Sequence, residues 1–310
     1  MNLNPSSPLS SRIAVLIPCY NEEVSIERVI EDFKKSIPDA EIYVYDNNST
    51  DGTARIARQC GACVRQVDLQ GKGYVVCQMF ADIDADYYVL VDGDATYEAA
   101  AAPRMVSLAQ EKYLDMVNGV RVTEQRDAYR PGHVLGNMML TGCVTLIFGR
   151  RISDLLSGYR VFSRRYVRSF PILCSGFEIE TFLSVHALEM AMPIGEVVTK
   201  YVERPEGSSS KLKTYQDGFR ILLTIINLVK MEKPLFFFSV IGAIFAVIGL
   251  SIGIPVTIEF MNTHMVPKLP RTLLATGLMI LAGLSFVCGL IMDMITLSRK
   301  ENKRLAYIRR

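Results

Sequence analysis

Two long stretches without charged side chains constrain this chain more than any other feature. Residues 235–258 and 272–292 contain no Asp, Glu, Lys or Arg. A helix rises ~1.5 Å per residue, so each stretch is long enough to cross a hydrocarbon core of about 30 Å. Uncharged runs of this length are uncommon in the core helices of soluble domains, which is the alternative interpretation. The sequence therefore predicts two membrane-spanning helices near its C-terminal end.

The charges that flank these stretches predict their orientation. The segment after the second stretch is rich in basic residues, namely Arg299, Lys300, Lys303, Arg304, Arg309 and Arg310. The connecting loop, residues 259–271, holds only Lys268 and Arg271 as basic residues. Because basic residues favour the cytoplasmic side, we expect a multi-pass protein of the cell (inner) membrane with both termini in the cytoplasm.

This orientation divides the chain into three predicted parts. Residues 1–213 form a cytoplasmic domain, and residues 234–310 form a transmembrane hairpin with a basic tail. Between them, residues 214–233 carry one polar stripe on an otherwise apolar helix. Next to a membrane span, this pattern predicts a helix that lies in the membrane interface, with a buried core helix as the alternative.

The cytoplasmic part alternates between strand and helix patterns. Apolar strands are predicted at residues 13–17, 41–45, 62–67, 87–91 and 116–122, and helices at residues 24–36, 54–60, 72–83, 103–111, 133–148 and 215–231. Repeated strand–helix units predict an α/β fold, with a parallel sheet covered by helices on both faces. Polar clusters at residues 18–23, 46–51 and 92–94 each follow a strand. In such sheets, ligands bind beyond the carboxyl ends of the strands, so these clusters predict a nucleotide site.

Charge is distributed unevenly along the cytoplasmic part. Residues 1–120 carry 10 basic and 18 acidic side chains, whereas residues 121–233 carry 16 basic and 11 acidic ones. An acidic first half suits a divalent-cation site, and a basic second half suits phosphates and the headgroups of membrane lipids. Nothing in this pattern points to a nucleic-acid partner.

The acidic pair Asp92 and Asp94 is the most specific chemical feature. Both residues directly follow a predicted strand, and a single glycine separates them. Two carboxylates at that position can hold Mg²⁺ or Mn²⁺ together with the oxygens of a diphosphate. We therefore expect Asp92 and Asp94 to be metal ligands, with the cation offsetting charge on a departing nucleotide diphosphate.

Four motifs in this half resemble glycosyltransferase family 2 in their order and spacing. They are Ile17-Pro-Cys-Tyr-Asn-Glu-Glu23, Asp46-Asn-Asn-Ser-Thr-Asp-Gly-Thr53, Gly71-Lys-Gly73 and Asp92-Gly-Asp94. The resemblance implies a GT-A-type (Rossmann-like), mostly parallel sheet domain. It implies donor-binding roles for Pro18, Tyr20, Glu22, Asp46, Lys72 and Asp92, and a metal-binding, catalytic role for Asp94.

The second half resembles one branch of that family. Asp154-Leu-Leu-Ser-Gly-Tyr-Arg160 is similar to the D-x-x-S-G-F-R segment of dolichol-phosphate mannose synthases and bacterial polyprenyl-phosphate glycosyltransferases. Gly176-Phe-Glu-Ile-Glu180 resembles their F-E-x-E segment. Arg204-Pro-Glu-Gly-Ser-Ser-Ser-Lys211 resembles their R-x-x-G-x-S-K loop, one residue longer here, so Ser209 or Ser210 takes the serine position.

This second resemblance implies roles on the acceptor side. Arg204, Ser210 and Lys211 would bind the acceptor phosphate, and Arg160 would help to position it. Asp154 would act as a base or as an orienting carboxylate. A purely structural cap or ion pair is the alternative for Asp154, and the sequence does not decide between them.

The resulting prediction is an inverting transfer of a sugar from a nucleotide sugar to a polyprenyl phosphate, for the synthesis or modification of cell-surface glycans. The 46–51 segment resembles uridine-binding members, which favours a UDP-sugar, and the acceptor is undecaprenyl or dolichyl phosphate. A non-polyprenyl acceptor and a non-catalytic membrane scaffold are the alternatives. A processive synthase with a Q-x-x-R-W motif is excluded, because the chain contains no tryptophan. The two spans also leave lipid-facing surface for a homo-oligomer.

Overall fold

The computed structural model describes residues 11–122, 131–149, 152–171, 179–202, 214–265 and 269–308. The strands are β1 (Ile13–Cys19), β2 (Glu41–Asp46), β3 (Cys63–Gln66), β4 (Tyr87–Leu90), β5 (Met116–Val122), β6 (Arg160–Ser163) and β7 (Ile194–Lys200). The helices are α1 (Ile26–Ser36), α2 (Thr53–Gln59), α3 (Lys72–Asp82), η1 (Ala99–Ala101), α4 (Ala102–Glu111), α5 (Pro131–Phe148), α6 (Arg164–Ser169), α7 (Ile179–Glu189), α8 (Thr214–Glu232), α9 (Pro234–Thr263) and α10 (Leu269–Ile308). Two compact units result, one of Met1–Phe219 with Lys303–Arg310 and one of Arg220–Asn302.

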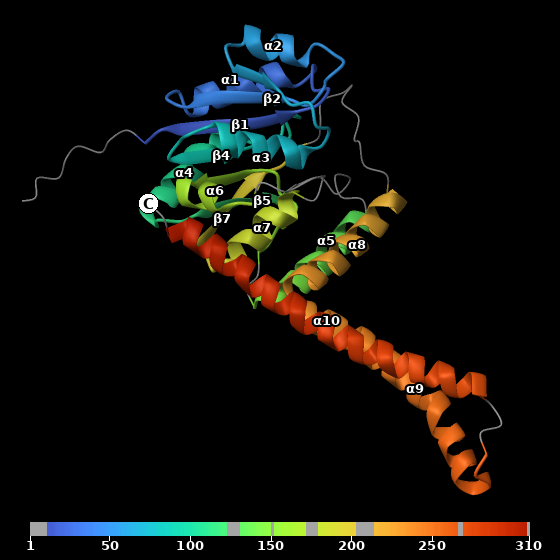
Figure 1. Ribbon diagram of the computed structural model, residues 1–310. Helices are drawn as coiled ribbons and strands as arrows, with labels where there is room; N and C mark the ends of the chain where they lie inside the picture. The colour runs from blue at the N-terminus through green and yellow to red at the C-terminus, as the bar shows by residue number, and fades with distance from the viewer. Residues whose placement is uncertain are drawn as a thin grey trace, which may run out of the picture. The chain divides into compact units, whose positions relative to one another are not determined.

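The first unit is built on a seven-stranded sheet with the order β3-β2-β1-β4-β6-β5-β7 (Figure 1). All neighbouring strands run parallel except β6, which is antiparallel to both β4 and β5. The predicted α/β class with a mostly parallel sheet is therefore confirmed. The inserted antiparallel strand β6 was not predicted, and it places Arg160, the last residue of the Asp154–Arg160 motif, beside Asn118 of β5.

Helices cover both faces of this sheet, as the alternating pattern predicts. On one face, Phe33 of α1 and Met105 of α4 belong to the same core cluster as Val15 and Ile17 of β1. On the other face, Phe80 of α3 makes edge-to-face ring contacts with Tyr88, Phe162 and Phe170. Successive residues of a strand point to opposite faces, so a strand buried on both sides must be apolar throughout, as β1 is.

The helix predicted at residues 54–60 is also confirmed, within one residue at each end. Helix α2 ends at Gln59, and Gly61 follows with a φ of 72°. That left-handed conformation costs little for glycine, because it has no Cβ atom. The chain then turns directly into β3.

The second unit contains α9 and most of α10, the two long apolar helices that the sequence predicts. Helices α9 and α10 are long and apolar enough to cross a membrane, and only 11% and 6% of their most apolar windows are buried. Core helices of a soluble domain would be mostly buried. The two helices lie side by side (Figure 1), and glycines bring them close, since Cβ atoms built on Gly242 and Gly289 would lie 3.0 Å from the Ala282 carbonyl oxygen and 3.1 Å from the Phe238 Cβ. Small residues of this kind are typical of helix packing in membranes.

Candidate active site

The loops after β1, β2 and β4 are tied together at one edge of the sheet. The Asn21 amide donates to Ser49 Oγ at 2.9 Å, which joins the loop after β1 to the loop after β2. Ser25 Oγ donates to the Gly93 carbonyl oxygen at 2.7 Å, which joins the first of these loops to the Asp92–Asp94 turn. Three sequence-distant polar clusters therefore meet at the carboxyl ends of parallel strands, as predicted.

Asn47 connects this edge to the loop before α3. Its side-chain amide donates to the carbonyl oxygens of Val67 and Leu69, at 3.0 and 2.8 Å. Its side-chain oxygen accepts from the Gly71 amide at 2.7 Å. Gly71 has a φ of 140°, a conformation that favours glycine. Asn47 and Gly71 thus set the position from which Lys72 begins α3.

Asp46 presents an unused hydrogen-bond acceptor at the same edge. Its side chain is only 5% exposed, and its Oδ2 accepts from the Ser49 amide at 3.2 Å. Its Oδ1 is buried without a hydrogen-bond partner among the described residues. A buried acceptor without a donor is costly, so this oxygen fits a donor group of a ligand. The other donor residues predicted on this side are half-buried: Pro18 lies near the end of β1, and Tyr20 and Glu22 lie in the loop that follows it.

Lys72 lies between two carboxylates. Its Nζ is 2.5 Å from Asp92 Oδ1 and 2.5 Å from Glu180 Oε1. Burial lowers the pKa of Lys72, but the Asp92 and Glu180 carboxylates raise the same pKa by more, so the amine stays protonated. The site thus contains a fixed cation beside Asp92. Glu180 was not among the predicted site residues, although the motif at residues 176–180 could have drawn attention to it.

Asp94 is nearly buried and is oriented by Thr96. The Thr96 hydroxyl donates to Asp94 Oδ1 at 2.6 Å, and the Thr96 amide approaches the same oxygen at 3.3 Å. Within the described part of the chain, no group of three or more His, Cys, Asp or Glu side chains could hold a metal ion. Mg²⁺ commonly takes one or two carboxylates and completes its shell with phosphate oxygens and water. Asp94 fits that mode of binding as one carboxylate ligand. Asp92 is the second carboxylate nearby, and it also pairs with Lys72.

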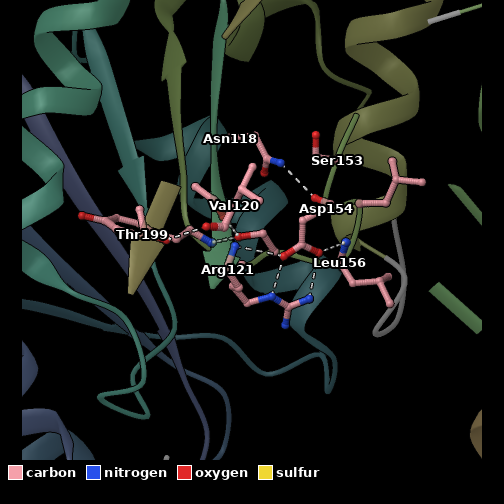
Figure 2. A network of polar contacts seen from close by, with 12 residues as sticks. Asn118, Val120, Arg121, Ser153, Asp154, Leu156 and Thr199 are labelled. Atoms are coloured by element: carbon pink, nitrogen blue, oxygen red, sulfur yellow. Dashed lines mark hydrogen bonds and ion pairs between the residues drawn. The ribbon is translucent and has the colours of Figure 1, made fainter. Parts of the chain in front are cut away.

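Asp154 forms a paired, partly buried contact with Arg121 (Figure 2). Arg121 Nε donates to Asp154 Oδ2 at 2.7 Å, and Arg121 Nη2 donates to Asp154 Oδ1 at 2.8 Å. The backbone amides of Arg121 and Leu156 also approach the carboxylate, each at 3.3 Å. Such two-point arginine–carboxylate pairs fix geometry as well as charge. Four donors surround this carboxylate, which favours the orienting role over the role of a base.

Arg121 was missed by the sequence analysis. It lies at the end of β5, where no recognised motif marks it, and only the tertiary structure brings it to Asp154. Its guanidinium also lies over the ring of Tyr201, 5.4 Å from the centroid. An arginine near the end of a strand is a weak signal, so the sequence alone did not single out Arg121.

Arg160 lies in the interior of the sheet domain. Its side chain is fully buried, and its guanidinium donates to the carbonyl oxygens of Ser157 and Leu155 at 2.9 and 2.7 Å, and to Ser184 Oγ at 2.9 Å. Burial lowers the pKa of Arg160. Because these donors are used within the protein, Arg160 holds the 155–157 turn against α7. The role in positioning the acceptor phosphate, which the resemblance implies, stays a prediction.

Gly158 lies against the side chain of Asp92. A Cβ atom built on Gly158 would lie 2.9 Å from Asp92 Cγ, so any larger residue there would displace the Asp92 carboxylate. The Gly158 amide also donates to the hydroxyl of Tyr97 at 2.9 Å. The Asp154–Arg160 segment therefore packs directly on the Asp92 turn. The predicted acceptor residues Arg204, Ser209, Ser210 and Lys211 lie outside the described residues.

Comparison with known proteins identifies the family. The model of Glycosyl transferase family 2 matches residues 14–170. This range includes every site residue described above except Glu180, Ser184 and Tyr201. The chain belongs to glycosyltransferase family 2.

Relatives and a solved structure extend this assignment. "Glycosyltransferase AglJ" of Haloferax volcanii is 32% identical over 306 residues, covering 96% of this chain and 98% of that protein. "Dolichyl-phosphate hexose transferase" of the same organism is 26% identical, covering 71% of this chain and 95% of that protein. A crystal structure of Mycobacterium tuberculosis glucosyl-3-phosphoglycerate synthase, in complex with Mn²⁺, UDP and glucosyl-3-phosphoglycerate, has a TM-score of 0.58 at 22% identity, covering 71% of this chain and 80% of that one. The predicted GT-A-type fold is thus confirmed.

Proposed function

We propose that this family 2 glycosyltransferase transfers a sugar from a UDP-sugar to a polyprenyl phosphate at the cytoplasmic face of the membrane. The observation that carries the proposal is the contact at Gly158. Gly158 packs on Asp92, at the sheet edge that also carries Asp46, Lys72 and Asp94. Gly158 belongs to the same segment as Asp154, which holds Arg121 in place. Two candidate membrane helices in the same chain and a relative named for a dolichyl-phosphate acceptor support the lipid as the substrate.

The donor would be held by the first half of the chain. The unpaired Asp46 Oδ1 would accept from the N–H of a nucleobase such as uracil, and Pro18 and Tyr20 would lie beside the base and ribose. Lys72 would contact the diphosphate while Asp92 and Glu180 keep it in place. Mg²⁺ or Mn²⁺ on Asp94 would offset charge on the departing diphosphate. The solved structure with UDP and Mn²⁺ supports this donor class.

The acceptor would need positioning more than activation. A phosphate monoester is already anionic near pH 7, so its oxygen can attack the anomeric carbon without a strong base. The bond from that carbon to the nucleotide diphosphate breaks, and the diphosphate leaves with the electron pair. Arg121, with Arg204 and Lys211 from the second half, would orient the attacking oxygen opposite the leaving group. A single displacement of this kind inverts the anomeric centre.

The reaction can be tested directly. The purified protein in lipid vesicles is incubated with radiolabelled UDP- and GDP-sugars and either undecaprenyl or dolichyl phosphate. We expect label in the organic phase with a UDP-sugar, and an anomeric configuration opposite to that of the donor. Donor turnover without any label on either lipid would overturn the acceptor assignment.

The proposed topology has structural support as well as the charge pattern. Lys303, near the end of α10, contacts Glu189 of α7, and both residues belong to the first compact unit. This contact supports the proposal that the end of α10 lies on the same side of the membrane as the sheet domain. A single cysteine placed in the 259–265 segment should react with an impermeant reagent added outside intact cells. A cysteine that replaces Ala306 should not react with this reagent. Its labelling from outside would contradict a hairpin with both ends in the cytoplasm.

A further inference from the structure

The end of α10 contacts two buried carboxylates of the sheet domain. Lys303 Nζ lies 2.6 Å from Glu189 Oε2, and the Glu189 side chain is only 1% exposed. One turn further on, the hydroxyl of Tyr307 donates to Asp115 Oδ2 at 2.7 Å. Asp115 is completely buried. Buried carboxylates are costly unless they are paired or hydrogen-bonded, so these contacts are more than incidental surface pairs.

Tyr307 is held from two sides. Its hydroxyl reaches Asp115, and the guanidinium of Arg165 lies over its ring, 5.4 Å from the centroid. Arg165 in turn pairs with Asp115 Oδ1 at 3.1 Å, and Ser163 Oγ donates to the same oxygen at 2.5 Å. The sheet domain thus provides a formed site for one tyrosine, made from the β6–α6 connection and the start of β5.

The two anchored carboxylates belong to elements that also supply the active site. Glu189 is the last residue of α7, and Glu180 in the first turn of the same helix holds Lys72. Asp115 directly precedes β5, and Arg121 near the other end of that strand pairs with Asp154. The end of α10 therefore contacts the end of α7 that is remote from Glu180, and the end of β5 that is remote from Arg121.

We propose that residues 303–308 form a docking segment that positions the active site for an acceptor in the bilayer. Lys303 and Tyr307 are positioning residues, since they touch neither substrate. The segment continues without a break from a candidate membrane helix, so docking links the sheet domain to the lipid-embedded part of the chain. The inference rests on the proposed lipid-linked reaction. A purely stabilising role would affect soluble and bilayer-bound acceptors alike.

The test uses the full chain in lipid vesicles with Lys303→Gln, Tyr307→Phe and the double variant. Arg304→Gln is the matched control, because Arg304 is an exposed cation in the same turn. We expect the KM for long-chain polyprenyl phosphate in the bilayer to rise about tenfold in the double variant, because the tether sets the effective concentration of the acceptor. The KM for the UDP-sugar and the rate with a short-chain, water-soluble prenyl phosphate should stay within about twofold.

Amide hydrogen exchange provides a readout that does not depend on activity. In the double variant, residues 303–308, β5 and α7 should exchange faster than in the control, because their anchoring contacts are lost. Unchanged exchange would overturn the docking itself. Equal losses with both acceptors would reject the positioning role. Transfer to neither acceptor by the unaltered protein would reject the proposed function, while the exchange experiment still decides on docking. Should the double variant not fold, Tyr307→Phe removes a single hydroxyl and answers the same questions.

Discussion

Replacing Asp154 with asparagine would separate an orienting carboxylate from a catalytic base. The carboxylate accepts two hydrogen bonds from the Arg121 guanidinium, at 2.7 and 2.8 Å, and both side chains are largely buried. In Asp154→Asn the amide oxygen can keep one of these bonds, whereas the amide nitrogen faces a donor. A charge-assisted hydrogen bond contributes about 1.5–3 kcal/mol, and breaking a buried pair costs about 3–5 kcal/mol.

We therefore expect a loss of about 3 kcal/mol in unfolding free energy, and a displaced Arg121. If the same free energy is lost from the transition state, kcat/KM for the acceptor falls by about a hundredfold. Because an orienting group does not exchange protons, the pH–rate profile should keep its shape and be lowered uniformly. Loss of a base would instead make the remaining rate rise tenfold with each pH unit.

The assay is the initial rate of sugar transfer between pH 5.5 and 8.5, together with thermal unfolding in detergent. Ser153→Ala is the control, because Ser153 neighbours Asp154 but bonds to Glu196 instead. A variant with kcat/KM within about threefold of the control and an unchanged melting temperature would refute the orienting role. A profile that gains a steep dependence on pH would assign the base role to Asp154.

Three further changes test other parts of the site. Asp94→Ala should lower the transfer rate by about a hundredfold or more and abolish its dependence on Mg²⁺ or Mn²⁺, whereas full turnover of the unaltered protein in excess EDTA would contradict a metal role. Lys211→Ala should raise the KM for polyprenyl phosphate about tenfold or more and leave UDP-sugar affinity in calorimetry unchanged; a large loss of donor affinity would move this residue to the donor side. Burial, with Lys303 nearby, lowers the pKa of His186 from 6.5 to about 3, so its protonation favours the unfolded chain, and stability is lost as the pH falls below 6.5. Between pH 7 and 5 this loss amounts to about 2 kcal/mol, and His186→Gln should show a smaller fall in melting temperature over that range than the unaltered protein.

Local patterns in the sequence predicted most of the first half of the sheet. The first five strands and their helices lie within a few residues of the predicted positions, because apolar periodicity and capping act over short distances. The two apolar helices followed from length and charge alone, since a bilayer imposes both. The edge that gathers Asp46, Lys72 and Asp92 followed from parallel topology, which brings the carboxyl ends of strands together.

Pairings across long sequence separations were decided only by the tertiary structure. Strand β6 is four residues long and carries no periodic signal, so its antiparallel place between β4 and β5 depends on distant partners. For the same reason, no motif predicted the pairing of Arg121 with Asp154 or the burial of Arg160. A motif states which side chains are near one another along the chain, whereas burial and hydrogen-bond partners depend on what packs against them.

The end of the chain shows the same limit. Its basic residues predicted a cytoplasmic tail, because the number of Lys and Arg residues beside a membrane span can be read from the sequence and sets the orientation of the span. The contacts of Lys303 with Glu189 and of Tyr307 with Asp115 join residues more than 100 positions apart. Whether a basic residue remains in solvent or pairs with a buried carboxylate is decided by the shape of the surface that it meets. The sequence by itself determined the fold class and the family motifs; the packed structure decided which of those charged groups are free to act.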